Sequence, residues 1–202
     1  FRPAPGAAER VAARHGLRRP YFLYVGALDV RKSPLALLRA AEVARAAGAD
    51  LDLVLAGAGG PQAPERLPGA TRLGYLAHEE LVDLYSAATC LVFPSRYEGF
   101  GLPLLEAMAC GCPVVAYRNS SLPEVTGDAA LLVADGDVAA LGAAAASVAA
   151  HAGLRERMRV AGLGRARLYT WRRSARATVA AYERVQTAHG ARAATANMMR
   201  EP

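Results

Sequence analysis

Six short, mostly apolar runs alternate with longer segments of helix-like composition, and this alternation limits the fold more than any other feature. Runs of four to six residues that are apolar at successive positions are typical of strands covered on both faces. The predicted strands are Tyr21–Val25, Leu51–Ala56, Thr71–Tyr75, Cys90–Phe93, Pro113–Tyr117 and Ala129–Val133. Strands that alternate with helices predict a parallel sheet.

The segments between and after these runs are predicted to be helical. Ser33 and Pro34 have the residue types of an N-cap and a first helical position, and Gly48 suits the end of that helix. The predicted helices are Pro34–Ala47, Glu79–Ala88, Pro103–Cys110, Val138–His151, Leu154–Leu168 and Ser174–Gln186. Right-handed crossovers then give an α/β fold, a doubly wound Rossmann-like sheet of six parallel strands with helices on both faces.

The length of 202 residues predicts one sizeable core. We expect a domain over residues 19–187, preceded by a linker or entering helix (1–18) and followed by a loosely ordered tail (188–202). No run of 18 or more apolar residues and no signal-peptide pattern is present, so we expect a cytoplasmic protein. Cys90, Cys110 and Cys112 are expected to be buried apolar residues of a reducing compartment.

Four predicted strands end in or are followed by segments rich in glycine, charge or aromatic residues: Gly26–Lys32, Gly57–Gly60, Tyr75 and Ser95–Leu102. In a doubly wound sheet the ligand crevice lies beyond the carboxyl ends of the strands, where these segments would meet.

The segment from Ser95 to Glu106 (SRYEGFGLPLLE) carries most of the functional information. Glu98 and Glu106 stand eight residues apart, and Gly99 and Gly101 between them allow a close backbone approach to a ligand. Pro103 suits the first turn of a helix, whose free N–H groups attract phosphate. This arrangement of carboxylates around an anion-binding helix start suits a nucleotide sugar.

The segment strongly resembles the Glu-x7-Glu signature of retaining GT-B glycosyltransferases, particularly glycosyltransferase family 4. The resemblance extends from about Tyr21 to Val185 and includes further motifs in the family's order. They are Val25–Lys32, Leu53–Gly59, Leu73–Tyr75, Ala107–Val115 and Ser120–Val125. The resemblance implies the C-terminal, donor-binding half of a GT-B fold and a mannosyltransferase-like hexosyltransferase.

The resemblance also implies roles for individual residues. Lys32 and Arg31 would neutralise the diphosphate in place of a metal ion, so that no metal or other cofactor is expected. The family's usual arginine position holds Ala27 here, and Arg31 would help Lys32 or replace that arginine. Glu98 would lie by the transferred sugar, near its C3 hydroxyl, and Glu106 would accept hydrogen bonds from the ribose. The remaining donor-binding residues implied include Gly26. The backbone amides of Phe100, Gly101 and Leu102 would contact the sugar and phosphates, and the backbone around Tyr75 and Leu76 would border the nucleobase.

The expected partners follow from the same resemblance. The donor would be a GDP- or UDP-sugar, with GDP-mannose favoured by the Arg31–Lys32 and Ser120–Glu124 motifs. The acceptor-binding N-terminal domain would be missing, so that this chain alone is expected to be inactive; no nucleic acid is expected. Arginines cluster in the late helices, where a solvated face is the first interpretation. A peripheral contact with the inner face of a membrane, or with a lipid-linked acceptor, is the second.

Two other functions remain open on the sequence alone. One is an NAD-type Rossmann domain, to which the glycines of Gly57–Pro61 are a weak match because no helix obviously starts there. The other is a binding or scaffolding module that kept the fold and lost the chemistry, against which the intact Lys32, Glu98 and Glu106 speak.

Overall fold

A computed structural model describes residues 1–59 and 67–198 of the chain, with side chains described up to residue 187. Contacts divide it into two units, residues 1–166 and 167–202. In its described part, up to residue 198, the second unit contains one helix, α8 (Trp171–Met198). This helix includes the predicted Ser174–Gln186 and continues into the range expected as a tail, whose last residues, 199–202, lie outside the described part.

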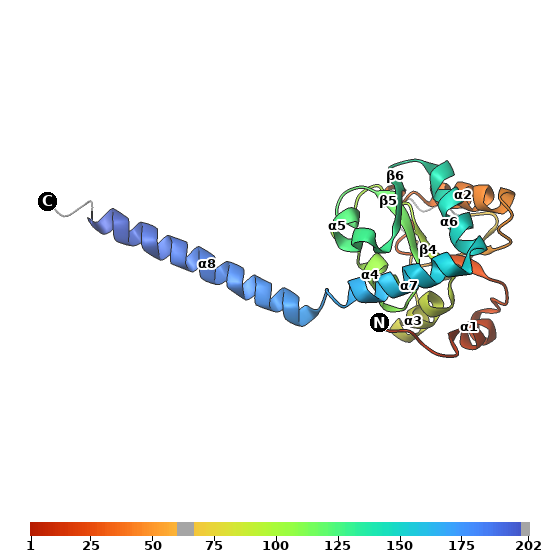
Figure 1. Ribbon diagram of the computed structural model, residues 1–202, viewed down its shortest axis with the longest axis horizontal. Helices are drawn as coiled ribbons and strands as arrows, with labels where there is room; N and C mark the ends of the chain where they lie inside the picture. Colours follow the sequence, from red (N-terminus) through yellow and green to blue (C-terminus); the bar gives the residue numbers. More distant parts are fainter. Residues whose placement is uncertain (60–66, 199–202) are drawn as a thin grey trace. The chain divides into compact units, whose positions relative to one another are not determined.

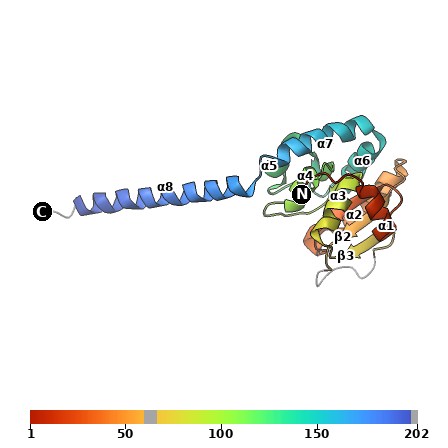
Figure 2. The ribbon, with the colours of Figure 1, turned by 90° about the horizontal axis from the view of Figure 1, so that it is seen from below.

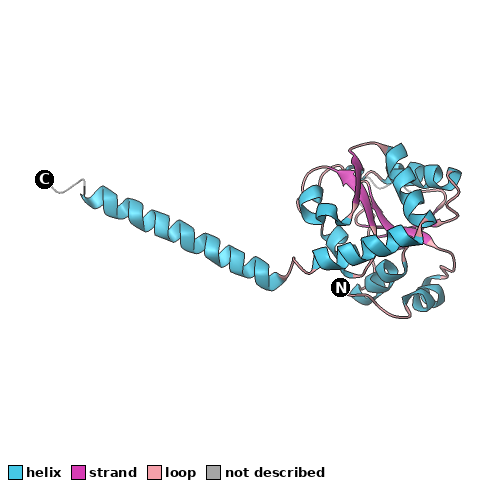
Figure 3. Ribbon diagram, viewed as in Figure 1, coloured by secondary structure: helices cyan, strands magenta, loops and turns pink. Residues whose placement is uncertain are grey.

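The first unit is built around a six-stranded parallel sheet with the order β3-β2-β1-β4-β5-β6. Figure 3 shows its strands in magenta among the helices. The strands are β1 (Tyr21–Val25), β2 (Asp52–Ala56), β3 (Ala70–Gly74), β4 (Cys90–Phe93), β5 (Val114–Arg118) and β6 (Leu131–Ala134). All six predicted strands are confirmed, each within two residues at either end. The doubly wound Rossmann-like topology is therefore confirmed as well.

Helices surround this sheet (Figure 1). They are α1 (Ala7–His15), α2 (Pro34–Ala46), α3 (His78–Ala87), α4 (Leu102–Ala109), α5 (Leu122–Thr126), α6 (Val138–Ala150) and α7 (Ala152–Ala166), with short 3-10 helices at Val30–Lys32 and Gly127–Ala129. Helix α2 packs on α6, α1 on α3, and α4 on α7. The sequence did not predict α5, which is a short helix of five residues.

The order of the strands reverses between β1 and β4, because the chain builds one half of the sheet outward from β1 and then returns to its other side. Figure 2 shows β2 and β3 side by side in the first half. Loops after β1 and β4 leave the sheet in this region, which is the usual ligand-binding position of such folds.

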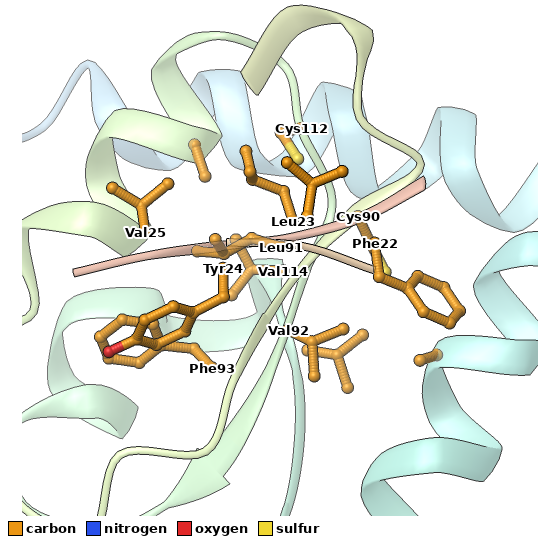
Figure 4. Packing of buried hydrophobic residues seen from close by; sticks show 14 of the residues in the cluster. Phe22, Leu23, Tyr24, Val25, Cys90, Leu91, Val92, Phe93, Cys112 and Val114 are labelled. Carbon is orange, nitrogen blue, oxygen red and sulfur yellow. The ribbon is translucent and has the colours of Figure 1, made fainter. Parts of the chain in front are cut away.

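Apolar side chains of β1 and β4 fill the centre of the sheet (Figure 4). The rings of Tyr24 and Phe93 stack with their centroids 5.8 Å apart, directly before the two loops. Cys90, Cys110 and Cys112 are buried and free, as the sequence predicted, and burial raises the pKa of the Cys110 thiol to about 11.

Two loop residues, Ser33 and Gly57, have a positive φ. Ser33 takes the N-cap position of α2 but has a left-handed backbone, φ 51°, and makes no side-chain capping bond. Gly57 has φ 139°, and a Cβ there would lie 2.1 Å from the carbonyl oxygen of Gly26, so the two loop glycines approach too closely for a side chain.

Among the described helices, none is by itself long and apolar enough to span a membrane; α6 and α7 pass such a test only as a bent pair.

Candidate functional site

The loop after β1 carries Lys32 on a short 3-10 helix. Asp29 caps this helix, its Oδ1 accepting the Lys32 N–H at 3.1 Å. At the start of the loop the phenol of Tyr24 donates to the carbonyl of Ala27 at 3.0 Å. Lys32 is the only lysine in the sequence. Its Nζ lies 5.5 Å from the ring centroid of Phe93, at the end of β4.

Lys32 and Glu98 form an ion pair at the point where the strand order reverses. Their side chains are only 17% and 12% exposed. The two loops are also joined through the main chain, since the Arg96 N–H donates to the carbonyl of Arg31 at 2.9 Å. An enclosed charge needs a partner, because desolvation without one is costly. Each of these groups supplies that partner to the other.

Arg31 joins the site through its carbonyl rather than its charge. Its side chain is 72% exposed, and its guanidinium lies 3.6 Å from Oδ2 of Asp29. The predicted contact of Arg31 with a diphosphate therefore stays a prediction. Lys32 is the basic residue that the structure brings to Glu98.

Glu106 lies on α4, which begins at Leu102 after Gly101 in the N-cap position. Gly101 has φ 94°, and a Cβ there would lie 2.8 Å from Cδ2 of Leu122, so that glycine is required. Burial raises the pKa of the Glu106 carboxyl, and a hydrogen bond from Tyr85 opposes this rise. The Tyr85 phenol donates to Oε2 of Glu106 at 3.0 Å. The two carboxylates of the Glu-x7-Glu segment thus have different partners: Glu98 pairs with Lys32, and Glu106 accepts from Tyr85.

Sequence reasoning missed Tyr85, because its place on the buried face of α3 resembles an ordinary core position. It also gave no individual role to the Asn119–Ser121 segment after β5. Ser120 Oγ accepts the Glu98 N–H at 3.1 Å. The single hydroxyl proton of Ser121 is shared between the carbonyls of Glu98 and Phe100, which lie 3.0 and 2.9 Å from its Oγ. Three short polar residues, one position after the predicted strand Pro113–Tyr117, were the available signal.

The other predicted binding residues line the neighbouring strand ends. The Gly26 N–H donates to Ala56, and the Gly57 N–H donates to Gly74, at 2.9 and 2.7 Å, so the ends of β1, β2 and β3 are joined in a row. After β3, Tyr75 is 87% exposed and Leu76 is buried.

The remaining predictions concern α4 and the β2 loop. Phe100 and Leu102 are exposed before and at the start of α4. Of the predicted Gly57–Gly60 segment, Gly60 lies outside the described residues. Within the described part, no three His, Cys, Asp or Glu side chains gather as a metal site would require.

The fold and its structural neighbours place the chain in the class of GT-B glycosyltransferases. It belongs to the family described as glycosyl transferases group 1, whose sequence profile matches residues 19–151. The resemblance and the fold class predicted from the sequence are therefore confirmed.

Individual relatives support this assignment. The O-antigen chain mannosyltransferase B of Escherichia coli is 38% identical over 173 residues, which cover 81% of this chain and 45% of that protein. The structure of sucrose-phosphate synthase from Thermosynechococcus elongatus is 31% identical, with a TM-score of 0.73, covering 93% of this chain and 50% of that one.

A third comparison concerns the fold alone. The C-terminal domain of a glycosyl transferase group 1 family protein from Francisella tularensis is 22% identical, with a TM-score of 0.66; the match covers 82% of this chain and 93% of that domain. The chain spans half or less of the length of the curated relatives it matches first, between 31% and 48%.

Proposed function

We propose that this chain is the donor-binding domain of a retaining, metal-independent hexosyltransferase. The observation that carries the proposal is the pairing of Lys32 with Glu98 at the strand-order reversal, beside the start of α4. This position places one cation, one carboxylate and the N-terminus of a helix around the usual ligand crevice of the fold.

The diphosphate of the donor would bind between Lys32 and the N-terminus of α4. Pro103 has no N–H, and the Leu104 N–H donates to the carbonyl of Gly101 at 3.0 Å, so the contact would come from the Leu102 N–H. The helix dipole favours an anion at the same end. Both features would also stabilise the charge that develops on the departing diphosphate. The site thereby supplies a positive environment without a metal ion.

Binding would require Lys32 to exchange its partner. In the structure its ammonium is paired with Glu98. A diphosphate that takes the ammonium leaves the Glu98 carboxylate free to accept a hydrogen bond from a sugar hydroxyl. Glu106 lies further along α4 and is held by a hydrogen bond from Tyr85 of α3. It would accept hydrogen bonds from the ribose.

For the chemical step we propose same-face attack, with retention of configuration. The departing phosphate oxygen would take the proton of the acceptor hydroxyl, so neither carboxylate needs to act as an acid or base. The acceptor would bind to a part of the protein outside this chain, in keeping with the share of its relatives that the chain covers.

Among donors, we propose GDP-mannose. A mannosyltransferase among the relatives supports this choice, as do the Arg31–Lys32 and Ser120–Glu124 motifs. Calorimetric titration with GDP-mannose, UDP-glucose, ADP-glucose and the three free nucleotides tests the donor. We expect GDP-mannose to bind most tightly. Tighter binding of another nucleotide sugar would correct the donor, and no binding of any would refute the proposed function.

A further inference from the structure

The main chain of Glu98 is held by side chains from another loop. Both of its polar groups are engaged: the N–H of Glu98 donates to Ser120 Oγ at 3.1 Å, and its carbonyl accepts from Ser121 Oγ at 3.0 Å. The carboxylate at the other end of the residue is paired with Lys32. Glu98 is therefore fixed both at its backbone and at its charged end.

The hydrogen bonds behind Ser120 run in one direction. Its hydroxyl donates to Oδ1 of Asn119 at 2.9 Å, and Nδ2 of Asn119 donates to Oδ1 of Asp135 at 2.8 Å and to the carbonyl of Ser95 at 3.0 Å. The donors thus lead from the Glu98 N–H to a carboxylate just beyond β6. Hydrogen bonds in such a chain polarise and strengthen one another, and hydrogen bonds to a charged group are the strongest.

Ser120 has a left-handed backbone with φ 44°, which is uncommon for a residue other than glycine. Such a conformation persists when the surroundings over-determine it. Here the two hydrogen bonds of the Ser120 hydroxyl supply that constraint.

We propose that Asn119, Ser120, Ser121 and Asp135 are positioning residues that determine how well the site distinguishes a nucleotide sugar from the bare nucleotide. They act through Glu98, by holding its carboxylate where a sugar hydroxyl reaches it once the diphosphate has engaged Lys32. This inference rests on the proposed function, in which Glu98 meets the transferred sugar.

Asp135→Ala is the sharpest test, because Asp135 acts at the far end of the network. Its matched control is Asp137→Ala, two residues away, where Asp137 Oδ1 accepts the Ala140 N–H at 2.9 Å and caps α6. The affinities of the full chain for GDP-mannose and for GDP are measured by calorimetry, with thermal unfolding measured in parallel. We expect Asp135→Ala to lower the ratio of the two affinities roughly three- to tenfold, the effect of one lost hydrogen bond. Asp137→Ala should lower the melting temperature and leave the ratio unchanged.

Variants of the serines separate the hydroxyl from the backbone. Both Ser120→Gly and Ser120→Ala remove the hydroxyl, but only the glycine relieves the strain of the left-handed backbone. If the hydroxyl is what positions Glu98, both variants should lower the ratio of the two affinities. Ser121→Ala should lower it too, and Ser121→Thr, which keeps a hydroxyl, should restore it. Equal losses of stability and of both affinities would show a merely structural role and overturn the inference.

A ligand-free measurement makes the test independent of donor choice. Because Lys32 is the only lysine, lysine labelled with nitrogen-15 at Nζ reports on one site. Asp135→Ala should shift that signal and Asp137→Ala should not; an unshifted signal overturns the inference. Wild-type protein that prefers GDP-mannose, with an unchanged ratio in every variant, also overturns the inference and leaves the proposed function standing. Wild-type protein that binds no nucleotide sugar overturns both.

Discussion

The phenol of Tyr85, on α3, donates a hydrogen bond of 3.0 Å to Oε2 of Glu106, on α4. Tyr85 is fully buried, and burial raises the pKa of its phenol, so it stays a neutral donor over the whole physiological range. The bond fixes one oxygen of Glu106 and leaves the other for a ligand. Under the proposed function, the core of the domain therefore orients the carboxylate that binds ribose.

Tyr85→Phe should weaken binding of the nucleotide diphosphate while leaving the fold intact, because the ring still fills its place and only the hydroxyl is lost. We expect a loss of about 1.5–3 kcal/mol, typical of a hydrogen bond to a charged group. Calorimetry with GDP measures it, and an unchanged affinity would show that Tyr85 has no part in orienting Glu106.

The pH dependence of stability should carry the signature of Glu106. Because burial raises its pKa in the folded chain, its contribution to the free energy of unfolding is fully present below the ordinary glutamate pKa, about 4.3. That contribution is lost as pH rises through the raised folded pKa. Urea unfolding of wild type and Glu106→Gln across this window measures the effect. The free energy of unfolding of wild type, relative to that of Glu106→Gln, should fall with rising pH. A difference that stays constant across the window would contradict the prediction.

Glu98→Gln should strengthen binding of bare GDP, because the neutral side chain no longer competes with the diphosphate for the Lys32 ammonium. It should weaken the preference for GDP-mannose over GDP. Lys32→Ala should instead lower the affinity for GDP itself by about 1.5–3 kcal/mol. Arg31→Ala, at an exposed side chain, should have the smaller effect. Weaker GDP binding by Glu98→Gln would show that the ion pair does not compete with the ligand.

Gly57→Ala should destabilise the domain by at least about 3 kcal/mol, because a Cβ would meet a carbonyl oxygen in a backbone conformation that disfavours side chains. Gly164→Ala, in helix α7, is the control: a Cβ there meets nothing within 4 Å. It should raise stability by up to about 1 kcal/mol. Urea unfolding of both variants checks the pair, and a Gly57→Ala variant as stable as wild type would contradict the close approach.

Donor binding should be insensitive to chelation, because Lys32 and the start of α4 supply the compensating charge under the proposed function. Calorimetric titration of GDP-mannose with EDTA and with added Mg²⁺ should give the same affinity. Binding that disappears with the chelator would refute metal independence.

The sequence determined the elements of this protein because their signals are local. A run such as Tyr21–Val25 is apolar at successive positions because both faces of a central strand are covered, and this requirement is visible in any five-residue window. The segment around Glu98 and Glu106 was equally local, since both carboxylates and the helix start lie within twelve residues. Fold class, family and candidate carboxylates could all be predicted on this basis.

Only the tertiary structure decided which partners those groups have. Lys32 and Glu98 are 66 residues apart, and Glu98 and Ser120 are 22 apart. They meet because the strand order places the ends of β1, β4 and β5 side by side, and no local pattern records that order. Tyr85 shows the same limit: its buried position follows from helix periodicity, but the carboxylate it meets belongs to another helix. Hydrogen bonds between loops depend on distances of a few tenths of an ångström, which packing of the whole core sets.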